Sequence, residues 1–258
     1  MSELQLIGQE LRPTFWFRGH ADASWKLLPG PLRPDFVNRV NQFNVQPNDP
    51  DSLRAAIEQT ESLINEQFRR EGASLFSANA EAVQIYFTAQ HHGLPTRLLD
   101  WTTNPLAALF FAVSQEADKD GEVLGVIPDW RLTFGPQANP QKEPQPPVAQ
   151  RHPLVVKTVG YFLNSAERPT DALIVPVLPD LCLARMLKQG ACFTLHMPSC
   201  PQINESCVVR IPILRNAKAV LIEELRSVRV NWATLYPDLD HVAQEIRDDW
   251  KLGPRRRL

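Results

Sequence analysis

The chain has 258 residues, of which 43% are hydrophobic and 22% are charged, the composition of an ordinary soluble globular protein with a sizeable core. Its formal net charge of −2 argues against a protein that holds nucleic acid mainly through bulk electrostatic attraction. No apolar stretch approaches the roughly 20 residues that span a bilayer, and the first residues lack the basic and apolar regions of a secretory signal. We therefore expect a cytoplasmic protein that contacts no membrane.

The first third of the chain predicts one strand and two helices. Residues 11–19 have the aromatic-rich pattern of a short strand, and a polar link over residues 38–50 should lead to a helix capped by Asp51 or Ser52. A second helix should begin near Asn79 and end at Gly93. The apolar face of the first helix would carry Leu53, Ile57, Ile64 and Phe68.

The clearest helix start in the chain is at Asn104 and Pro105. Asn104 is a favourable N-cap, and the missing N–H of Pro105 costs nothing at the first helical position. Residues 106–113 are apolar all round, which indicates a buried helix. Its positive N-terminal end would lie beside Thr102 and Thr103, a favourable place for a phosphate.

The second half of the chain predicts more strands and ends in helices. Strands are expected at residues 122–128, 173–178, 192–197 and 207–214, with a short helix over 180–188 that Gly190 closes. The proline-rich segment 134–153 has the composition of an exposed loop. The C-terminal end, 216–252, should be helical, with helices near 218–226 and 238–250. We expect a single α+β domain with a mixed or antiparallel sheet flanked by helices.

The four cysteines form no CxxC pair, which favours reduced, buried thiols. A metal site drawn through Cys192, His196, Cys200 and Cys207 would match no common zinc spacing. We expect no metal cofactor.

Two polar segments predict a site. Residues 89–105 carry two histidines, an arginine, an aspartate and a tryptophan between apolar runs, and Phe17-Arg18-Gly19 places another arginine at the end of a strand. Two arginines presented by different elements favour a pocket for an anionic ligand. We expect one cleft to gather Arg18, Gln90, His92, Arg97, Asp100 and Thr102.

These segments resemble a known family. Phe17-Arg18-Gly19 followed by Trp25, Leu28-Pro29 and Arg33 is similar to the motif that names the FRG domain. Residues 90–105 resemble its longest motif, residues 107–112 continue the match, and Arg185, residues 189–194 and residues 235–240 resemble its later blocks. The resemblance implies a single FRG domain over 1–258 in a bacterial or phage-associated protein, in a toxin–antitoxin or phage-defence setting. It names no reaction.

The layout of the two polar segments also resembles that of ADP-ribosyltransferases. This resemblance implies that Arg18 holds the phosphates of NAD as substrate, that Thr102 or Thr103 orients the nicotinamide side, and that a later glutamate serves catalysis. The late candidates Glu122, Glu205, Glu223 and Glu224 do not stand in the expected Gln/Glu-x-Glu pattern. The hypothesis assigns catalysis to Arg18, His92, Asp100 and Thr102, and ligand binding to Gly19, Gln90, Arg97, Trp101, Thr103, Asn104, Arg185 and Gln189.

Other interpretations of the same residues stay open. The pocket could recognise a nucleotide, another anionic ligand, or a protein or nucleic-acid partner without chemistry, as one half of a defence or toxin–antitoxin system. A ribonuclease could use His91 or His92 as acid and base with Arg97 as phosphate clamp. Structurally, Arg18 could simply pair with Asp100, and one of the two adjacent histidines should face the interior, since they lie about 100° apart on a helix.

Overall fold

The computed structural model describes residues 15–44, 49–135, 147–163, 166–180, 184–199, 202–236, 238–250 and 252. Within these ranges one seven-stranded sheet runs in the order β4-β5-β6-β2-β1-β3-β7. Its strands are β1 (Trp16–His20), β2 (Leu98–Thr102), β3 (Gly121–Val126), β4 (Val148–Ala149), β5 (Ile174–Leu178), β6 (Ala191–His196) and β7 (Val209–Ile213). Neighbouring strands are antiparallel except for the parallel pair β4–β5. This confirms the predicted α+β class with a mixed sheet flanked by helices.

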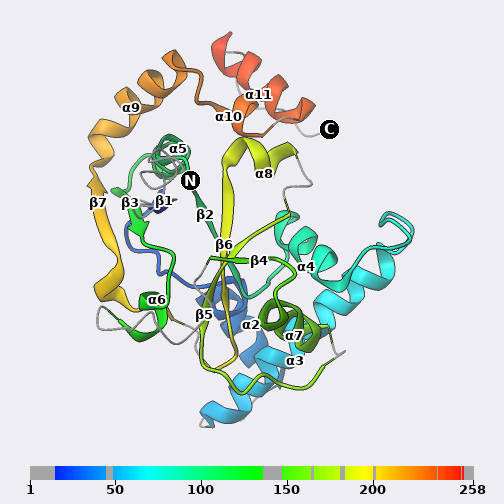
Figure 1. The fold of residues 1–258 in the computed structure, drawn as a ribbon. Coiled ribbons are helices and arrows are strands. Elements are labelled where there is room, and N and C mark those ends of the chain that lie inside the picture. The colour runs from blue at the N-terminus through cyan, green and yellow to red at the C-terminus, as the bar shows by residue number, and fades with distance from the viewer. Residues whose placement is uncertain are drawn as a thin grey trace, which may run out of the picture.

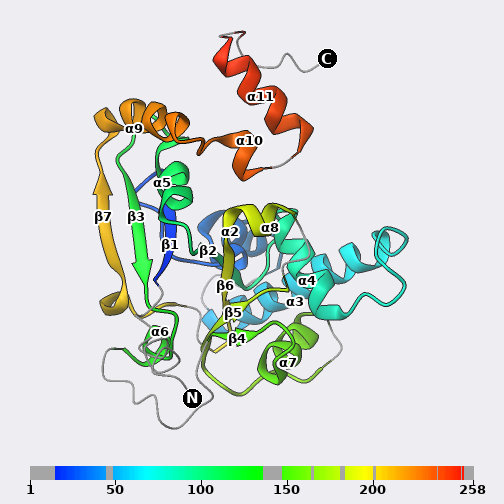
Figure 2. The same ribbon diagram turned by 45° about the horizontal axis from the view of Figure 1, so that its top comes forward.

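Helices lie on both sides of this sheet. They are α2 (Pro34–Asn44), α3 (Pro50–Glu71), α4 (Ala82–His91), α5 (Pro105–Val113), α6 (Arg131–Phe134), α7 (Pro153–Phe162), α8 (Ala184–Gln189), α9 (Arg215–Ser227), α10 (Trp232–Leu235) and α11 (Leu239–Asp249). Helices α3, α4 and α7 lie beside the β4–β5–β6 half of the sheet (Figure 1). Helices α9, α10 and α11 lie together at one end of the molecule (Figure 2). No helix in the described ranges is both long and apolar enough to cross a membrane.

Helix α5 packs directly on strand β1 because Gly19 has no side chain. A Cβ atom at Gly19 would lie 2.0 Å from the carbonyl oxygen of Ala108, so only glycine lets the two backbones approach this closely. The predicted helix start is confirmed: Asn104 Oδ1 accepts hydrogen bonds from the N–H groups of Leu106 at 3.0 Å and Ala107 at 3.4 Å. The tight contact with α5 therefore fixes the position of β1 in the sheet.

Several sequence predictions were wrong in the first third of the chain. Residues 34–44 form α2, although a link was predicted from residue 38, and residues 45–48 lie outside the described ranges. Asp49 caps α3, accepting from the N–H of Asp51 at 3.0 Å, because Pro50 already occupies the first helical position. Residues 98–102, in the middle of the polar segment 89–105, form strand β2, which was not predicted and which pairs with β6 along its whole length.

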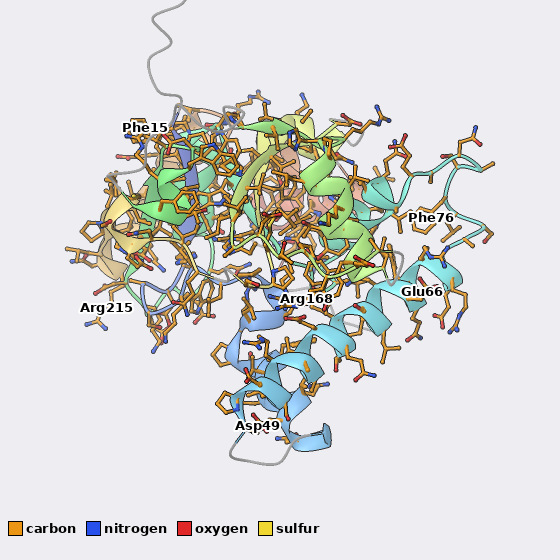
Figure 3. All side chains as sticks on the ribbon, turned by 60° about the horizontal axis from the view of Figure 1, so that its bottom comes forward. Phe15, Asp49, Glu66, Phe76, Arg168 and Arg215 are labelled. Atoms are coloured by element: carbon orange, nitrogen blue, oxygen red, sulfur yellow. The ribbon has the colours of Figure 1, made fainter. Side chains whose placement is uncertain are left out.

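The buried face of α3 is mostly polar, which corrects the predicted apolar stripe. Its buried residues are Ile57, Glu58, Glu61, Ser62 and Asn65, while Leu53, Ile64 and Phe68 are only half-buried. Figure 3 shows Arg168 beside the middle of this helix, between the labelled Asp49 and Glu66. The guanidinium of Arg168 donates to both carboxylate oxygens of Glu58 at 3.1 Å. Ion pairs thus replace part of the apolar packing expected for α3.

The second half of the chain contains elements that the sequence did not predict, among them α6. Helix α7 was not expected, and β4 lies inside the segment that was predicted as an exposed loop over 134–153. Val148 of β4 is buried, and residues 136–146 of that segment lie outside the described ranges. The strands β3, β5, β6 and β7 and the helices α9 and α11 lie within a few residues of their predicted positions.

Arg97 belongs to the core, 1% exposed, and not to a cleft. Its Nε atom donates to Glu61 Oε2 at 2.7 Å, and its guanidinium lies 5.2 Å from the ring centroid of Phe162. The Tyr86 hydroxyl donates to the other oxygen of Glu61 at 3.1 Å and accepts the N–H of Arg97 at 2.7 Å. Burial raises the pKa of Glu61 and the Arg97 charge opposes that shift, so the two side chains depend on each other.

Replacing Asn104 by Ala should lower the free energy of unfolding by about 1 kcal/mol, because two N–H groups of α5 lose their acceptor. Urea denaturation measures this loss. Asn104→Asp is the matched control, since it keeps a side-chain oxygen at the cap. An Asn104→Ala chain that unfolds at the wild-type urea concentration would contradict the assigned cap.

Replacing Arg97 by Met should lower the free energy of unfolding by about 3–5 kcal/mol, because Glu61 stays buried without its cation. Arg69→Met is the control: it breaks the exposed pair with Glu66 and should cost less than about 1 kcal/mol. The double variant Glu61→Leu with Arg97→Met should recover part of the loss. Equal losses of unfolding free energy in Arg97→Met and Arg69→Met would show that the buried pair stabilises the fold no more than the exposed pair does.

Candidate functional site

A cleft of about 1120 Å³ opens where strands β1 and β2 separate. The two strands pair at a single position, Phe17 opposite Thr102, whereas β1 pairs with β3 along its whole length. Both sides of the separation contribute to the walls, together with helices α2, α4, α5, α8, α10 and α11, strand β6 and several connecting segments. The predicted residues that line it are Arg18, Gly19, Gln90, His92, Asp100, Trp101, Thr102 and Gln189.

Arg18 spans the separation between the two strands. Its Nη1 atom donates to the backbone carbonyl oxygen of Asp100 at 2.7 Å and lies 3.9 Å from Asp100 Oδ2. Its Nε atom donates to His20 Nε2 at 3.0 Å. In the described part of the chain Nη2 donates to no protein atom, and 17% of the side chain is exposed. Burial lowers the pKa of Arg18 to about 10, partly offset by Asp100, so the guanidinium stays charged at neutral pH.

His20 is neutral and fixes the orientation of the Arg18 side chain. Burial, then the charges of Arg18 and Arg210, lower the pKa of His20 to about 3. An arginine Nε–H can only donate, so His20 Nε2 accepts and the ring proton is on Nδ1. Nδ1 lies 3.2 Å from Glu122 Oε1 and donates to it. The histidine therefore links the arginine in the cleft to a buried carboxylate.

The Glu122 carboxylate already accepts hydrogen bonds from protein side chains and does not line the cleft. Besides His20, it accepts two hydrogen bonds from Arg210 Nη1, at 2.7 and 2.8 Å, and Arg210 Nη2 donates to Glu205 at 2.8 Å. Arg18 and His20 on β1, Glu122 on β3 and Arg210 on β7 share one face of the sheet through their register. Two of the predicted late glutamates thus serve this network.

Asp100 is the carboxylate beside Arg18. Its side chain is 55% exposed, and Oδ2 accepts from Gln90 Nε2 at 2.8 Å. The Thr96 hydroxyl donates to the other end of the Gln90 amide. Helix α4 therefore orients the carboxylate through an amide that is itself held, while the carboxylate remains open to the cleft.

The threonines at the end of β2 have structural contacts. The Thr102 hydroxyl donates to the carbonyl oxygen of Gln189 and accepts from the N–H of Asn104 at 2.9 Å, so its proton is not free for a ligand. The N–H of Thr103 donates to the carbonyl oxygen of Gly190 at 3.0 Å. Thr103 and Asn104 do not line the cleft, so the structure does not bring them to the predicted ligand-binding residues that do.

The remaining predicted residues are divided between wall and scaffold. Trp101 is buried, and its indole N–H donates to Thr194 at 3.0 Å, so only part of its ring borders the cleft. The Gln189 amide donates to the carbonyl oxygen of Leu235 at 3.1 Å. Arg97 is in the core, which corrects its assignment. Arg185 belongs to α8, and its side chain lies outside the described part.

The two adjacent histidines both line the cleft, and neither is buried. Their ring centroids are 5.2 Å apart. The expectation that one faces the interior was wrong because α4 ends at His91, and His92 is already its C-cap.

Of the residues drawn into a metal site, Cys192 is buried with a raised thiol pKa, and Cys200 lies outside the described ranges. The described residues contain no group of three side chains placed to hold a metal ion.

Sequence reasoning missed several residues that line the cleft. Trp25 and Arg33 do so, although they stand in the motif that carried the resemblance; the signal was present but no role was assigned. Trp232, Tyr236 and His241 form part of the opposite wall from α10, its C-terminal flank and α11. His241 stacks on Tyr236 with centroids 4.4 Å apart. Nothing in the local sequence of these helices indicates which side of the molecule they cover.

Comparison with known proteins supports the resemblance. A family model described as the FRG domain matches residues 13–121. Searches of curated proteins and of solved structures each gave no match. The matched range holds β1, α2, α3, α4, β2 and α5, and with them Arg18, Gln90 and Asp100. The chain therefore matches the FRG domain over residues 13–121.

Proposed function

We propose that the cleft binds a nucleotide through its phosphate groups and that Arg18 is the principal phosphate ligand. The observation that carries this proposal is the guanidinium geometry. Nε and Nη1 are held by His20 and by the Asp100 carbonyl, and Nη2 has no acceptor in the described part of the chain. A fixed, charged donor at the edge of a cleft loses little conformational entropy when a phosphate oxygen accepts from it.

Arg33 supplies a second positive charge. It lines the same cleft, and its charge lowers the pKa values of both Arg18 and His20. Its Nε atom donates to the carbonyl oxygen of Leu28 at 3.2 Å, which holds the side chain close to the loop after β1. Two neighbouring guanidinium groups favour a ligand with more than one phosphate charge.

A second candidate function, ADP-ribosyl transfer from NAD, is favoured by Asp100. NAD carries a dianionic pyrophosphate and a cationic nicotinamide ring, and the cleft offers arginines beside an exposed carboxylate. In this reaction the bond between the ribose C1′ and the nicotinamide nitrogen breaks, and its electron pair leaves with nicotinamide. The Asp100 carboxylate would stabilise the positive charge on the ribose until a nucleophile of a protein or nucleic-acid target attacks and loses its proton. Glu122 is buried behind His20 and does not suit this role.

The ribonuclease hypothesis is weakened, because Arg97, its phosphate clamp, is buried against Glu61. A toxin–antitoxin or phage-defence setting is a proposal that depends on the resemblance of the motifs alone.

Replacing Arg18 by Met should weaken ADP binding by about 10- to 150-fold, since a charge-assisted hydrogen bond is lost. Arg18→Lys should restore little of the affinity, because an ammonium cannot reproduce the guanidinium fork. Isothermal titration calorimetry measures both, with Arg69→Met as the control for loss of an arginine outside the cleft. If Arg18→Met lowers the melting temperature sharply while the folded fraction binds ADP normally, Arg18 is only a structural partner of Asp100.

Replacing Asp100 by Asn should reduce nicotinamide release from NAD by about 100-fold, because the carboxylate charge is lost while the acceptor for Gln90 is kept. Binding of ADP should change far less. Asp35→Asn is the control, since Asp35 also lines the cleft. If the wild type binds ADP but releases no nicotinamide in the presence of a cell lysate, the chain is a non-catalytic binding module.

A further inference from the structure

Trp25 is an exposed aromatic residue that lines the cleft and takes no part in the proposed phosphate site. It is 44% exposed, although tryptophan is highly buried on average in folded proteins. Its ring meets the His20 ring at 65° with centroids 5.9 Å apart, so the two rings are not stacked on each other. A large part of the indole therefore faces the cleft and solvent.

The loop that carries Trp25 is ordered by short hydrogen bonds. The N–H of Ala23 donates to the carbonyl oxygen of Asp120 at 2.8 Å, and the N–H of Ser24 donates to Asp22 Oδ1 at 2.8 Å. Ala21 and Leu27, on either side, are 1% and 3% exposed. The chain is thus anchored before and after Trp25, and the ring is presented without any need for rearrangement on binding.

Trp25 and Arg18 contact the same imidazole. Arg18 Nε donates to His20 Nε2 at 3.0 Å, and the Trp25 ring packs against the same His20 ring. A neutral histidine, buried and fixed by Glu122, therefore sets the position of a guanidinium and of an exposed aromatic surface at once. This pairing of a phosphate ligand with a flat apolar surface matches the two chemical parts of a nucleotide.

Three aromatic residues on the opposite wall of the cleft pack on one another. Tyr236, Trp232 and His241 stack or tilt against one another, with centroids between 4.4 and 5.8 Å apart. Trp232 also packs edge-on against Phe110 at 4.9 Å. These rings close the opposite wall, whereas the indole of Trp25 is more exposed than any of them.

We infer that Trp25 forms the nucleobase subsite of the cleft: the base stacks on the indole while the phosphates bind Arg18 and Arg33. This inference rests on the proposed phosphate site and names the other part of its ligand. Stacking on an aromatic ring uses the face that every base has, so the subsite selects nucleotides over inorganic phosphates and not one base over another.

The test compares ADP with inorganic pyrophosphate on the full chain by titration calorimetry. The wild type should bind ADP about 5- to 150-fold more tightly than pyrophosphate, the contribution of one stacked base. Trp25→Leu should remove most of this difference and leave pyrophosphate binding unchanged, while Trp25→Phe should keep most of it. Trp250→Leu is the control, because Trp250 is 75% exposed and does not line the cleft.

A second measurement serves if Trp25→Leu folds poorly. ADP should quench the tryptophan fluorescence of the wild type, pyrophosphate should not, and the quenching should vanish in Trp25→Phe. Equal affinities of the wild type for the two ligands, or equal weakening of both by Trp25→Leu, would overturn the base subsite and leave the phosphate site standing. If neither ligand binds the wild type, the phosphate site is wrong and the subsite is wrong with it.

Discussion

The cleft depends on Arg18, whose guanidinium takes the place of backbone hydrogen bonds that are missing between β1 and β2. Strands β1 and β2 pair only at Phe17 and Thr102, so the Asp100 carbonyl oxygen, which continued pairing could have engaged, needs another donor. Arg18 supplies it, at 2.7 Å. The same side chain therefore holds the two strands at the distance that opens the cleft and presents a charged donor inside it. Structural and ligand-binding interpretations of Arg18 are compatible, because they use different nitrogen atoms of one guanidinium.

The Phe-Arg-Gly motif has a simple physical meaning in this sheet. Side chains alternate along a strand, so Phe17 and Gly19 face α5 while Arg18 faces His20 and Asp100. Gly19 lets α5 approach, which fixes the strand, and Arg18 is then positioned from the other face. Because His20 must accept from Arg18, it can do so only while neutral, and its pKa of about 3 keeps it neutral throughout the physiological range.

Features that depend on a few neighbouring residues could be predicted from the sequence. The cap at Asn104 needs only the Pro105 that follows it. Arg18, which was predicted at the end of a strand, lies in the middle of β1, because the strand continues through Gly19 to His20. The burial of Arg97 could not be predicted, because its partner Glu61 lies on a helix whose periodicity indicated an apolar face elsewhere. Strand β2 was missed because Leu98, Leu99, Trp101 and Thr102 are all buried, so both of its faces are covered and the usual alternation is absent. Convergence of Arg18 with Asp100 was predictable, but the network behind Arg18 was not, since it joins three strands that are distant in the chain.

The two walls of the cleft come from different parts of the chain. Arg18, Trp25, Arg33 and Asp100 lie within the matched FRG range, whereas Trp232, Tyr236 and His241 come from the C-terminal helices. The second wall is attached to the first through α5, where Phe110 packs on Trp232 and Phe111 on Tyr236. None of these aromatic contacts touches the His20–Glu122 network that orients Arg18. Changes in the C-terminal wall can therefore alter the size of the cleft, while the charge and geometry of Arg18 stay the same.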